Sequence, residues 1–178
     1  MRPPSSTPQR QQFVQIAYHV ADLDEAMPRF ARLMGIGPFL VRRHIGLSPV
    51  SYRGAAGELD ISAAHVQAGP VQVELVTQHC GNRSAFRDMF GPGEEGLHHV
   101  ALFPEDYEAM IAHYRSLGNE VATELVTPEG RGASYVDTVA TLGHMVEVYR
   151  VNESLFDFYG AVSDAARDWD GKTIAIEV

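Results

Sequence analysis

The strongest constraint on the fold is an internal repeat. The segment that begins at Gln15, QIAYHVADLDEAM, resembles the segment that begins at His99, HVALFPEDYEAM. The two copies also end alike, in Val-Glu-Leu-Val (73–76) and Val-Glu-Val-Tyr (146–149). Self-similarity of this kind predicts a fold that contains one structural unit twice.

Each copy has the pattern of a strand, a helix and three further strands. Alternating faces over 13–20 are typical of a strand, and Asp22 is then a suitable N-cap for a helix over 23–34 that ends at Gly35. Glycine, proline and serine separate the strands that follow. The predicted strands are 40–45, 59–67 and 71–77 in the first copy, and the second copy has a helix over 106–117 and strands over 120–126, 133–138 and 144–151.

This order predicts an α+β fold in which two βαβββ modules form one cupped mixed sheet, followed by a C-terminal helical extension. The first residues are rich in Pro, Ser, Gln and Arg, which is typical of a disordered tail. The expected divisions are that tail (1–12), a first module (13–78), a linker with a short helix (79–96), a second module (97–150), and a C-terminal helix and tail (151–178).

Composition and charge exclude several classes of protein. No apolar run is long enough to span a bilayer, and residues 1–12 lack the apolar stretch of a signal peptide. The net charge of −9 would repel a nucleic acid backbone. Since Cys80 is the only cysteine, an intramolecular disulfide is impossible, and we expect a cytoplasmic protein with no membrane or nucleic-acid partner.

Four polar residues occupy corresponding positions of the repeat, since Gln15 pairs with His99 and Glu74 pairs with Glu147. An ionised glutamate within an apolar strand is costly unless it has a partner, and a divalent cation would be that partner. Two carboxylates, one imidazole and one amide oxygen balance an M²⁺ ion. The four residues are therefore predicted to hold one Zn²⁺, Ni²⁺, Co²⁺, Mn²⁺ or Fe²⁺ ion.

Two adjacent histidines, His98 and His99, compete for one position in this set. Neighbouring strand residues face opposite sides, so only one of them can face the metal, and the alignment with Gln15 favours His99. His98 is then expected to pack toward the helix layer. Four further histidines have no spacing that is typical of metal ligands, namely His65, His79, His113 and His144.

The motifs resemble the vicinal-oxygen-chelate superfamily, which includes glyoxalase I, methylmalonyl-CoA epimerase, extradiol dioxygenases and fosfomycin-resistance proteins. The resemblance covers about 13–150 and is closest to the epimerase and glyoxalase branch. It is carried by Gly-Ile-Gly-Pro-Phe (35–39), Val-Glu-Leu-Val (73–76), Gly-Leu-His-His-Val-Ala (96–101) and Gly-His-Met-Val-Glu-Val (143–148).

The resemblance also bears on the ligand set. In that branch the metal ligands lie on the first and last strands of each module, and those positions here are Gln15, Glu74, His99 and Glu147. The set is similar to that of glyoxalase I, whereas the epimerases more often have histidine where this chain has Gln15. The ligand set thus favours a likeness to glyoxalase I, whereas the overall motif pattern favours a likeness to the epimerases.

What the resemblance implies chemically is a metal-dependent isomerase, epimerase or lyase acting on a small carbonyl or thioester substrate through an enolate-type intermediate. A carboxylate beside the metal would remove the α proton, and we nominate Glu147 first and Glu74 second. An epimerase needs a second base, for which Glu58 or Asp60 is available. Predicted substrate contacts are His19, on the same strand face as Gln15, together with Glu58, Tyr52 and Arg53, with Arg42 and Arg43 as further cations for an anionic group.

Two alternatives stay open from the sequence. One is an iron-dependent extradiol dioxygenase, which needs two histidines and one carboxylate, whereas the chain offers one histidine at these positions. The other is a metal-free binding protein like the bleomycin-resistance members, which would leave two glutamates in apolar strands without a partner. The superfamily resemblance also implies a homodimer, formed by closed or by swapped modules.

Overall fold

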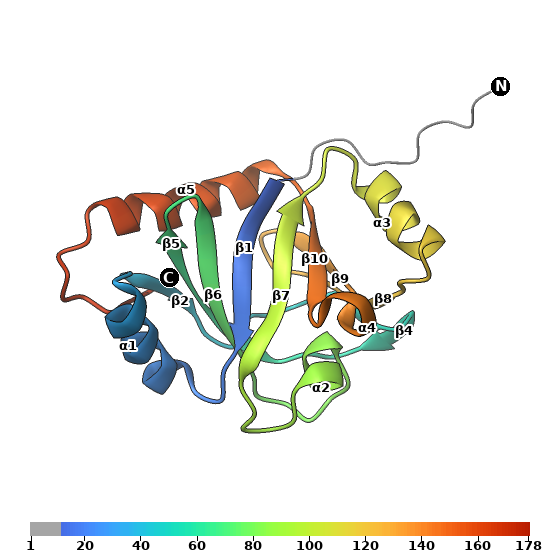
Figure 1. Cartoon of the computed structure of the whole chain (residues 1–178), viewed down its shortest axis with the longest axis horizontal. Helices are drawn as coiled ribbons and strands as arrows, with labels where there is room; N and C mark the ends of the chain where they lie inside the picture. Colours follow the sequence, from blue (N-terminus) through green and yellow to red (C-terminus); the bar gives the residue numbers. More distant parts are fainter. Residues whose placement is uncertain (1–11) are drawn as a thin grey trace.

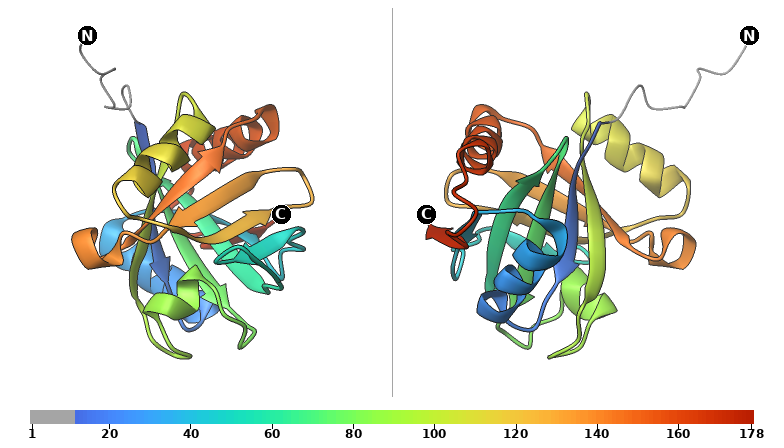
Figure 2. Two further views of the ribbon diagram at one scale, coloured as in Figure 1. Left: turned by 90° about the vertical axis from the view of Figure 1, so that its right-hand side faces the viewer. Right: turned by 60° about the vertical axis from the view of Figure 1, so that its left-hand side comes forward.

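The computed structural model describes residues 12–178. Apart from Gln12, the predicted disordered tail lies outside the described residues. Eleven strands form one mixed sheet in the order β11-β2-β5-β6-β1-β7-β10-β9-β8-β3-β4 (Figure 1). The two further views show how strongly this sheet curves, so that one face is concave (Figure 2). We call this concave face the cup.

The first half of the chain forms one side of the sheet. Asp22 caps the first helix as predicted, because its side chain accepts the backbone N–H groups of Asp24 and Glu25, and Gly35 ends the helix with a left-handed backbone. In space the strands follow the order β2-β5-β6-β1. The elements are β1 (Gln12–His19), α1 (Leu23–Met34), β2 (Phe39–Arg42), β5 (Ile61–Ala68) and β6 (Val71–Gln78).

The second half repeats this arrangement in reverse order, β7-β10-β9-β8. The halves join where β1 pairs with β7 antiparallel, and β6 and β10 each run parallel to their neighbour of that pair. The glutamate-bearing strands therefore flank the two central strands. The elements are α2 (Ala85–Met89) in the linker, then β7 (Gly96–Phe103), α3 (Tyr107–Ser116), β8 (Val121–Val126), β9 (Gly132–Val136), α4 (Val139–Leu142) and β10 (Met145–Arg150).

Separate apolar clusters occupy the two faces of the sheet. On the convex face, α1 packs on β2, β5 and β6 through residues such as Met27 and Leu75, and α3 packs on β10 through residues such as Met110 and Val148. In the cup, Tyr135, Met145 and the α5 residue Leu155 belong to another cluster. The helix α5 (Glu153–Arg167) thus lies over the cup, on the opposite side of the sheet from α1 and α3 (Figure 1).

Three strands and the short helix α4 were not predicted from the sequence. The strands β3 (Val50–Tyr52) and β4 (Ala55–Gly57) form a hairpin inserted in the first module, and β3 pairs with β8 of the second module. The strand β11 (Ala175–Glu177) pairs with β2 at the other edge. The predicted α+β fold with a cupped mixed sheet and a C-terminal helix is confirmed. No helix within residues 12–178 has the length and apolar character needed to cross a membrane.

Candidate metal centre

The four predicted ligand residues lie on the four central strands of the sheet. Glu74 is on β6, Gln15 on β1, His99 on β7 and Glu147 on β10. Each of the four residues is at most 7% exposed. Sequence-distant positions therefore converge in the cup because the repeat places the first and last strands of each module side by side.

Three of these side chains meet directly, and we call Glu74, His99 and Glu147 the buried cluster. The His99 Nε2 atom lies 3.2 Å from Glu74 Oε2 and 3.1 Å from Glu147 Oε2. One ligand atom from each residue lies within 4.8 Å of the others. The cluster thus presents one imidazole nitrogen and two carboxylate oxygens to a common point.

The buried cluster fits a divalent metal. In a tetrahedral site, two ligand atoms at about 2.0–2.2 Å from one Zn²⁺ ion lie about 3.3–3.6 Å apart, so the distances of 3.2 Å and 3.1 Å from His99 need to open only slightly to admit the ion. His99 Nε2 and Glu147 Oε2 are buried and form an ion pair at 3.1 Å, but within residues 12–178 neither atom has a hydrogen bond of good geometry. Buried polar atoms usually have a well-formed hydrogen bond, so an ion pair without one fits a ligand bound between the two atoms.

The two glutamates perturb the titration of the histidine between them. Burial lowers the pKa of His99, but the carboxylates of Glu147 and Glu74 outweigh it and raise this pKa to about 9. Burial raises the pKa of Glu74, but the adjacent His65 and His99 outweigh it and bring the pKa below its ordinary value. Positive charge is therefore strongly favoured at this point of the cup.

Gln15 lies on the same face of the sheet but has other partners. Its Oε1 atom accepts a hydrogen bond from the Tyr149 hydroxyl at 3.1 Å, and its Nε2 atom lies 3.5 Å from Gln72 Oε1. Its amide oxygen would have to leave Tyr149 to reach a metal. The role of Gln15 as fourth ligand stays a prediction.

His65 is a residue of the site that the sequence analysis missed. Its Nε2 atom lies 3.3 Å from Glu74 Oε1, because His65 on β5 is directly opposite Glu74 on β6. The tight turn at Gly69 and Pro70 joins these strands, so hairpin register could have revealed the pair. Both carboxylate oxygens of Glu74 thus face a histidine.

His98 orients the ring of His99. Its Nδ1 atom lies 2.8 Å from His99 Nδ1, which leaves Nε2 of His99 to face the two glutamates. The ring of His98 stacks on Phe86 of α2, with centroids 4.4 Å apart. His98 therefore packs on the short linker helix rather than on the long helices of the convex face, because a register shift in the β1–β7 pairing interrupts the alternation there.

A cavity of about 60 Å³ adjoins the buried cluster. Since a water molecule occupies about 30 Å³ of the liquid, this space holds roughly two waters. Neutral hydroxyls line it, because burial and the charge of Glu147 raise the pKa values of three tyrosines well above their ordinary range. The residues that line the cavity include Glu74, Glu147, Tyr135, Tyr149, Tyr159, His65, Phe158, Arg42 and Arg131.

The structure places the other predicted site residues away from this cavity. His19 Nδ1 lies 2.8 Å from the backbone oxygen of Glu94, and the His19 ring stacks on Phe90. Tyr52 and Glu58 line a separate open groove. His19, Glu58 and Tyr52 were predicted to contact a substrate in the cup, but other residues line the cavity there.

Arg53 and Asp60 also lie elsewhere than expected. Arg53 forms ion pairs with Asp88 at 2.7 Å and Asp137 at 2.8 Å, so its charge is balanced by these two carboxylates. Asp60 precedes β5 and faces His44 at 2.9 Å. The unpredicted β3–β4 hairpin explains the position of Arg53, because it carries 50–57 out to β8 and away from the buried cluster, whereas Asp60 lies before the first residue of β5.

Residues 14–136 match the sequence profile of the glyoxalase/bleomycin resistance protein/dioxygenase superfamily. The match covers more than half of the chain and includes Gln15, Glu74 and His99. The chain belongs to this superfamily. Because the match ends before β10, the place of Glu147 in the buried cluster rests on the structure. No curated protein sequence matches the chain significantly.

Solved structures support the same fold for this superfamily member. A hypothetical protein from Bacillus halodurans superposes with a TM-score of 0.57 at 15% identity, covering 82% of this chain and 97% of that one. Methylmalonyl-CoA epimerase from Mycobacterium tuberculosis superposes with a TM-score of 0.53 at 14% identity, covering 82% and 91%. At such identities the likeness shows the shared fold alone.

Proposed function

We propose that this superfamily member is a metal-dependent isomerase, epimerase or lyase that removes an α proton from a small carbonyl or thioester substrate. The observation that carries the proposal is the buried cluster of one imidazole and two carboxylates beside a cavity. A bound divalent metal would supply Lewis-acid polarisation of a substrate oxygen. Glu74, His99 and Glu147 would hold it, with Gln15 as a fourth ligand.

The two glutamates differ in how free they are to accept a proton. Both oxygens of Glu74 face a histidine, whereas only Oε2 of Glu147 does, at 3.1 Å from His99 Nε2. This leaves Glu147 with one carboxylate oxygen that no histidine contacts, and a base needs an oxygen that can reach the proton. We therefore assign proton abstraction to Glu147, with Glu74 as the alternative, and neutral hydroxyls of the cavity tyrosines can donate to the substrate.

Two arginines at the cavity favour a substrate with an anionic group. Arg42 and Arg131 share one carboxylate, Glu129, each at 2.7 Å, so one positive charge is left uncompensated within this group. The Arg131 guanidinium also stacks over Phe158 of α5 at 4.7 Å. A carboxylate or phosphate of the substrate is the natural partner for this pair.

The cavity also constrains how a substrate binds. Its volume is far below the roughly 300–1,000 Å³ of ordinary ligand pockets. Since Phe158 and Tyr159 of α5 form part of its wall, displacement of α5 would enlarge it, and its return would exclude water from the base. The reacting group alone, rather than a whole coenzyme, would then occupy the cup.

The test is proton exchange at the α carbon. Chelator-treated protein, reloaded separately with Zn²⁺, Ni²⁺, Co²⁺, Mn²⁺ or Fe²⁺, is incubated in D₂O with methylmalonyl-CoA, with a thioester lacking the carboxylate, and with a glutathione hemithioacetal. We expect metal-dependent deuterium uptake that favours anionic substrates and falls about 10²- to 10⁴-fold in Glu147→Gln. His113→Ala, which changes a histidine on α3, serves as the matched control and should keep full exchange.

Two results would remove the proposal. Exchange that is equal in Glu147→Gln and wild type would exclude Glu147 as the base. Metal-loaded protein that binds these compounds without any exchange would favour the binding-protein alternative. The dioxygenase alternative receives less support, because the buried cluster supplies two carboxylates and one histidine rather than one carboxylate and two histidines.

A further inference from the structure

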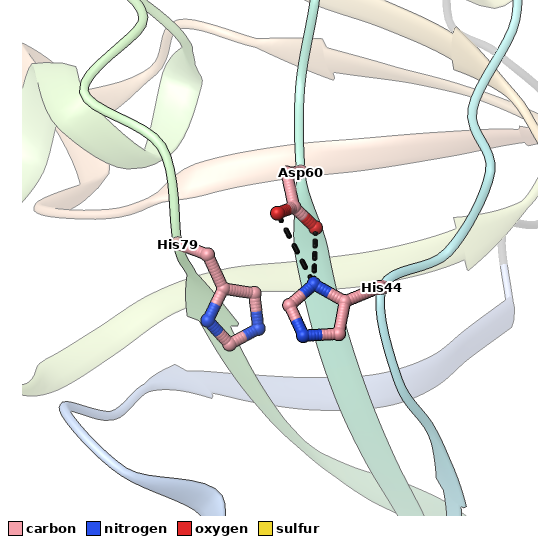
Figure 3. Close-up of side chains that lie close together, drawn as sticks. All are labelled: His44, Asp60 and His79. Atoms are coloured by element: carbon pink, nitrogen blue, oxygen red, sulfur yellow. Dashed lines mark hydrogen bonds and ion pairs between the residues drawn. The ribbon is translucent and has the colours of Figure 1, made fainter.

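A second group of metal-ligating side chains lies at one edge of the sheet. His44, Asp60 and His79 come from three different loops, and one ligand atom from each lies within 4.8 Å of the others. Figure 3 shows the two imidazoles side by side with the carboxylate of Asp60 above them. We call these three residues the surface cluster.

The side chains of the surface cluster are close enough to share one ion. His44 Nδ1 lies 2.9 Å and 3.1 Å from the two carboxylate oxygens of Asp60, and the rings of His44 and His79 have centroids 4.3 Å apart. The side chains of His44 and Asp60 are 64% and 44% exposed. An ion could therefore enter from solvent and keep water on its open side.

The fold brings these residues together and holds them there. His44 follows β2, Asp60 precedes β5 and His79 follows β6, and these three strands are neighbours in the sheet with alternating directions. The loops are tied by backbone hydrogen bonds, from Ile45 N–H to the Ile61 oxygen at 2.8 Å and from His79 N–H to the Asp60 oxygen at 2.9 Å. The cluster is thus set by the sheet itself.

One serine contacts both histidines of the surface cluster. Ser62 Oγ accepts the His44 backbone N–H at 2.9 Å and lies 2.7 Å from His79 Nε2. His44 has a φ of 46°, a left-handed conformation that non-glycine residues adopt at a cost, and this bond helps to hold it. Coordination through His79 Nε2 would require the Ser62 hydroxyl to rotate away, which one side-chain torsion allows.

We propose that His44, Asp60 and His79 form a second metal site, which binds one divalent transition metal of the zinc class independently of the buried cluster. Two imidazoles and one carboxylate suit Zn²⁺, Ni²⁺, Co²⁺ or Cu²⁺ better than Mg²⁺ or Ca²⁺, which prefer oxygen ligands alone. Three protein ligands leave one tetrahedral position for water. The ion would join the ends of β2, β5 and β6.

The two sites are separate by position. Asp60 is five residues from His65 along the chain, and His79 is five residues from Glu74, so each pair is roughly 16 Å apart at strand geometry. One ion cannot contact both clusters. Loss of one site therefore leaves the ligands of the other unchanged, and this makes them separable by substitution.

The experiment is calorimetric titration of the chelator-treated full chain with ZnCl₂ alone. Wild type should bind two equivalents. His44→Asn removes the imidazole but keeps a residue that tolerates the left-handed backbone, and His79→Ala removes the other imidazole. Each should weaken one of the two binding events at least 10-fold and leave the second unchanged. His113→Ala, the matched control, should still bind two equivalents.

Glu147→Gln separates this inference from the proposed function. In that variant the event assigned to the surface cluster should persist while the buried one is lost, so a failure of the buried site leaves the surface site measurable. Equal binding by wild type, His44→Asn and His79→Ala would overturn the inference. A binding event that is lost in these variants but has a Kd above about 0.1 mM, a binding free energy of about −5.5 kcal/mol, would also overturn the inference, because it would mark an adventitious ion only.

Discussion

At the scale of single residues, the buried cluster is costly without a ligand. Glu74, His99 and Glu147 are all buried, and even with His99 protonated the three side chains carry one net negative charge. A buried charge that lacks a partner destabilises a folded protein by several kcal/mol. A divalent cation removes this cost, which explains why apolar strands contain these residues.

His65 gives a prediction at the same scale. Because it contacts Glu74 Oε1 and leaves Oε2 to face His99, it should orient the carboxylate without ligating the ion. Loss of such an orienting contact usually weakens metal binding about 10- to 100-fold. We expect His65→Leu to weaken zinc binding at the buried cluster by that factor, measured by competition with a chromogenic chelator.

The control for this prediction is His44→Asn, which should leave the affinity of the buried cluster unchanged. Zinc affinity of His65→Leu equal to that of wild type would exclude an orienting role. Complete loss of binding would instead make His65 a direct ligand and bring the site closer to the set of two histidines and one carboxylate.

Part of the site could be predicted from the sequence at this scale. The repeat alone selected His99 over His98 and paired Glu74 with Glu147, because corresponding repeat positions meet at the β1–β7 junction. His65 could not be selected by repeat or by residue type, since its role comes from cross-strand register with Glu74. Gln15 was predicted on the face of the sheet where it lies, but no local sequence pattern indicates its hydrogen bond with Tyr149.

At the scale of elements, strongly patterned segments were predictable and short exposed ones were not. The helix over 23–34 was predicted with its observed bounds because the N-cap, apolar periodicity and terminal glycine agree. The hairpin of β3 and β4 has three-residue strands, of which β4 is fully exposed, so hydrophobic alternation is absent there. Because this hairpin was not predicted, the positions of Tyr52 and Arg53 away from the cavity beside the buried cluster were not foreseen, and their role as substrate contacts, like that of Glu58, stays a prediction.

The C-terminal segment supplies a prediction about an element. A Cβ atom on Gly37 would lie 2.5 Å from Cε2 of Trp169, the only tryptophan, so Gly37→Ala must push the indole away. The Trp169 Nε1–H donates to the Thr173 oxygen at 2.7 Å, just before β11. We expect about 1–3 kcal/mol of lost stability and a red-shifted tryptophan emission.

Limited proteolysis completes that test. Gly37→Ala should expose the segment after α5 to cleavage, whereas Gly81→Ala, where the added carbon has no atom within 4 Å, should leave the emission of Trp169 unchanged. Unaltered emission and cleavage in Gly37→Ala would mean that Trp169 does not pack on this glycine.

At the scale of the whole molecule, one chain builds the complete cup. Both halves join through β1 and β7 of the same chain, and all three residues of the buried cluster belong to it. Modules closed within one chain are therefore sufficient for the site, and the homodimer expected from the superfamily stays a prediction about surfaces outside it. The expected cytoplasmic location likewise stays a prediction.

The central claim is that the cup holds one divalent metal between Glu74, His99 and Glu147. The most direct test is anomalous diffraction from crystals of the protein soaked in ZnCl₂, recorded on both sides of the zinc absorption edge. We predict a peak within about 2.3 Å of His99 Nε2 and of one oxygen from each glutamate. Absence of a peak there, with the three side chains still paired to one another, would contradict the assignment.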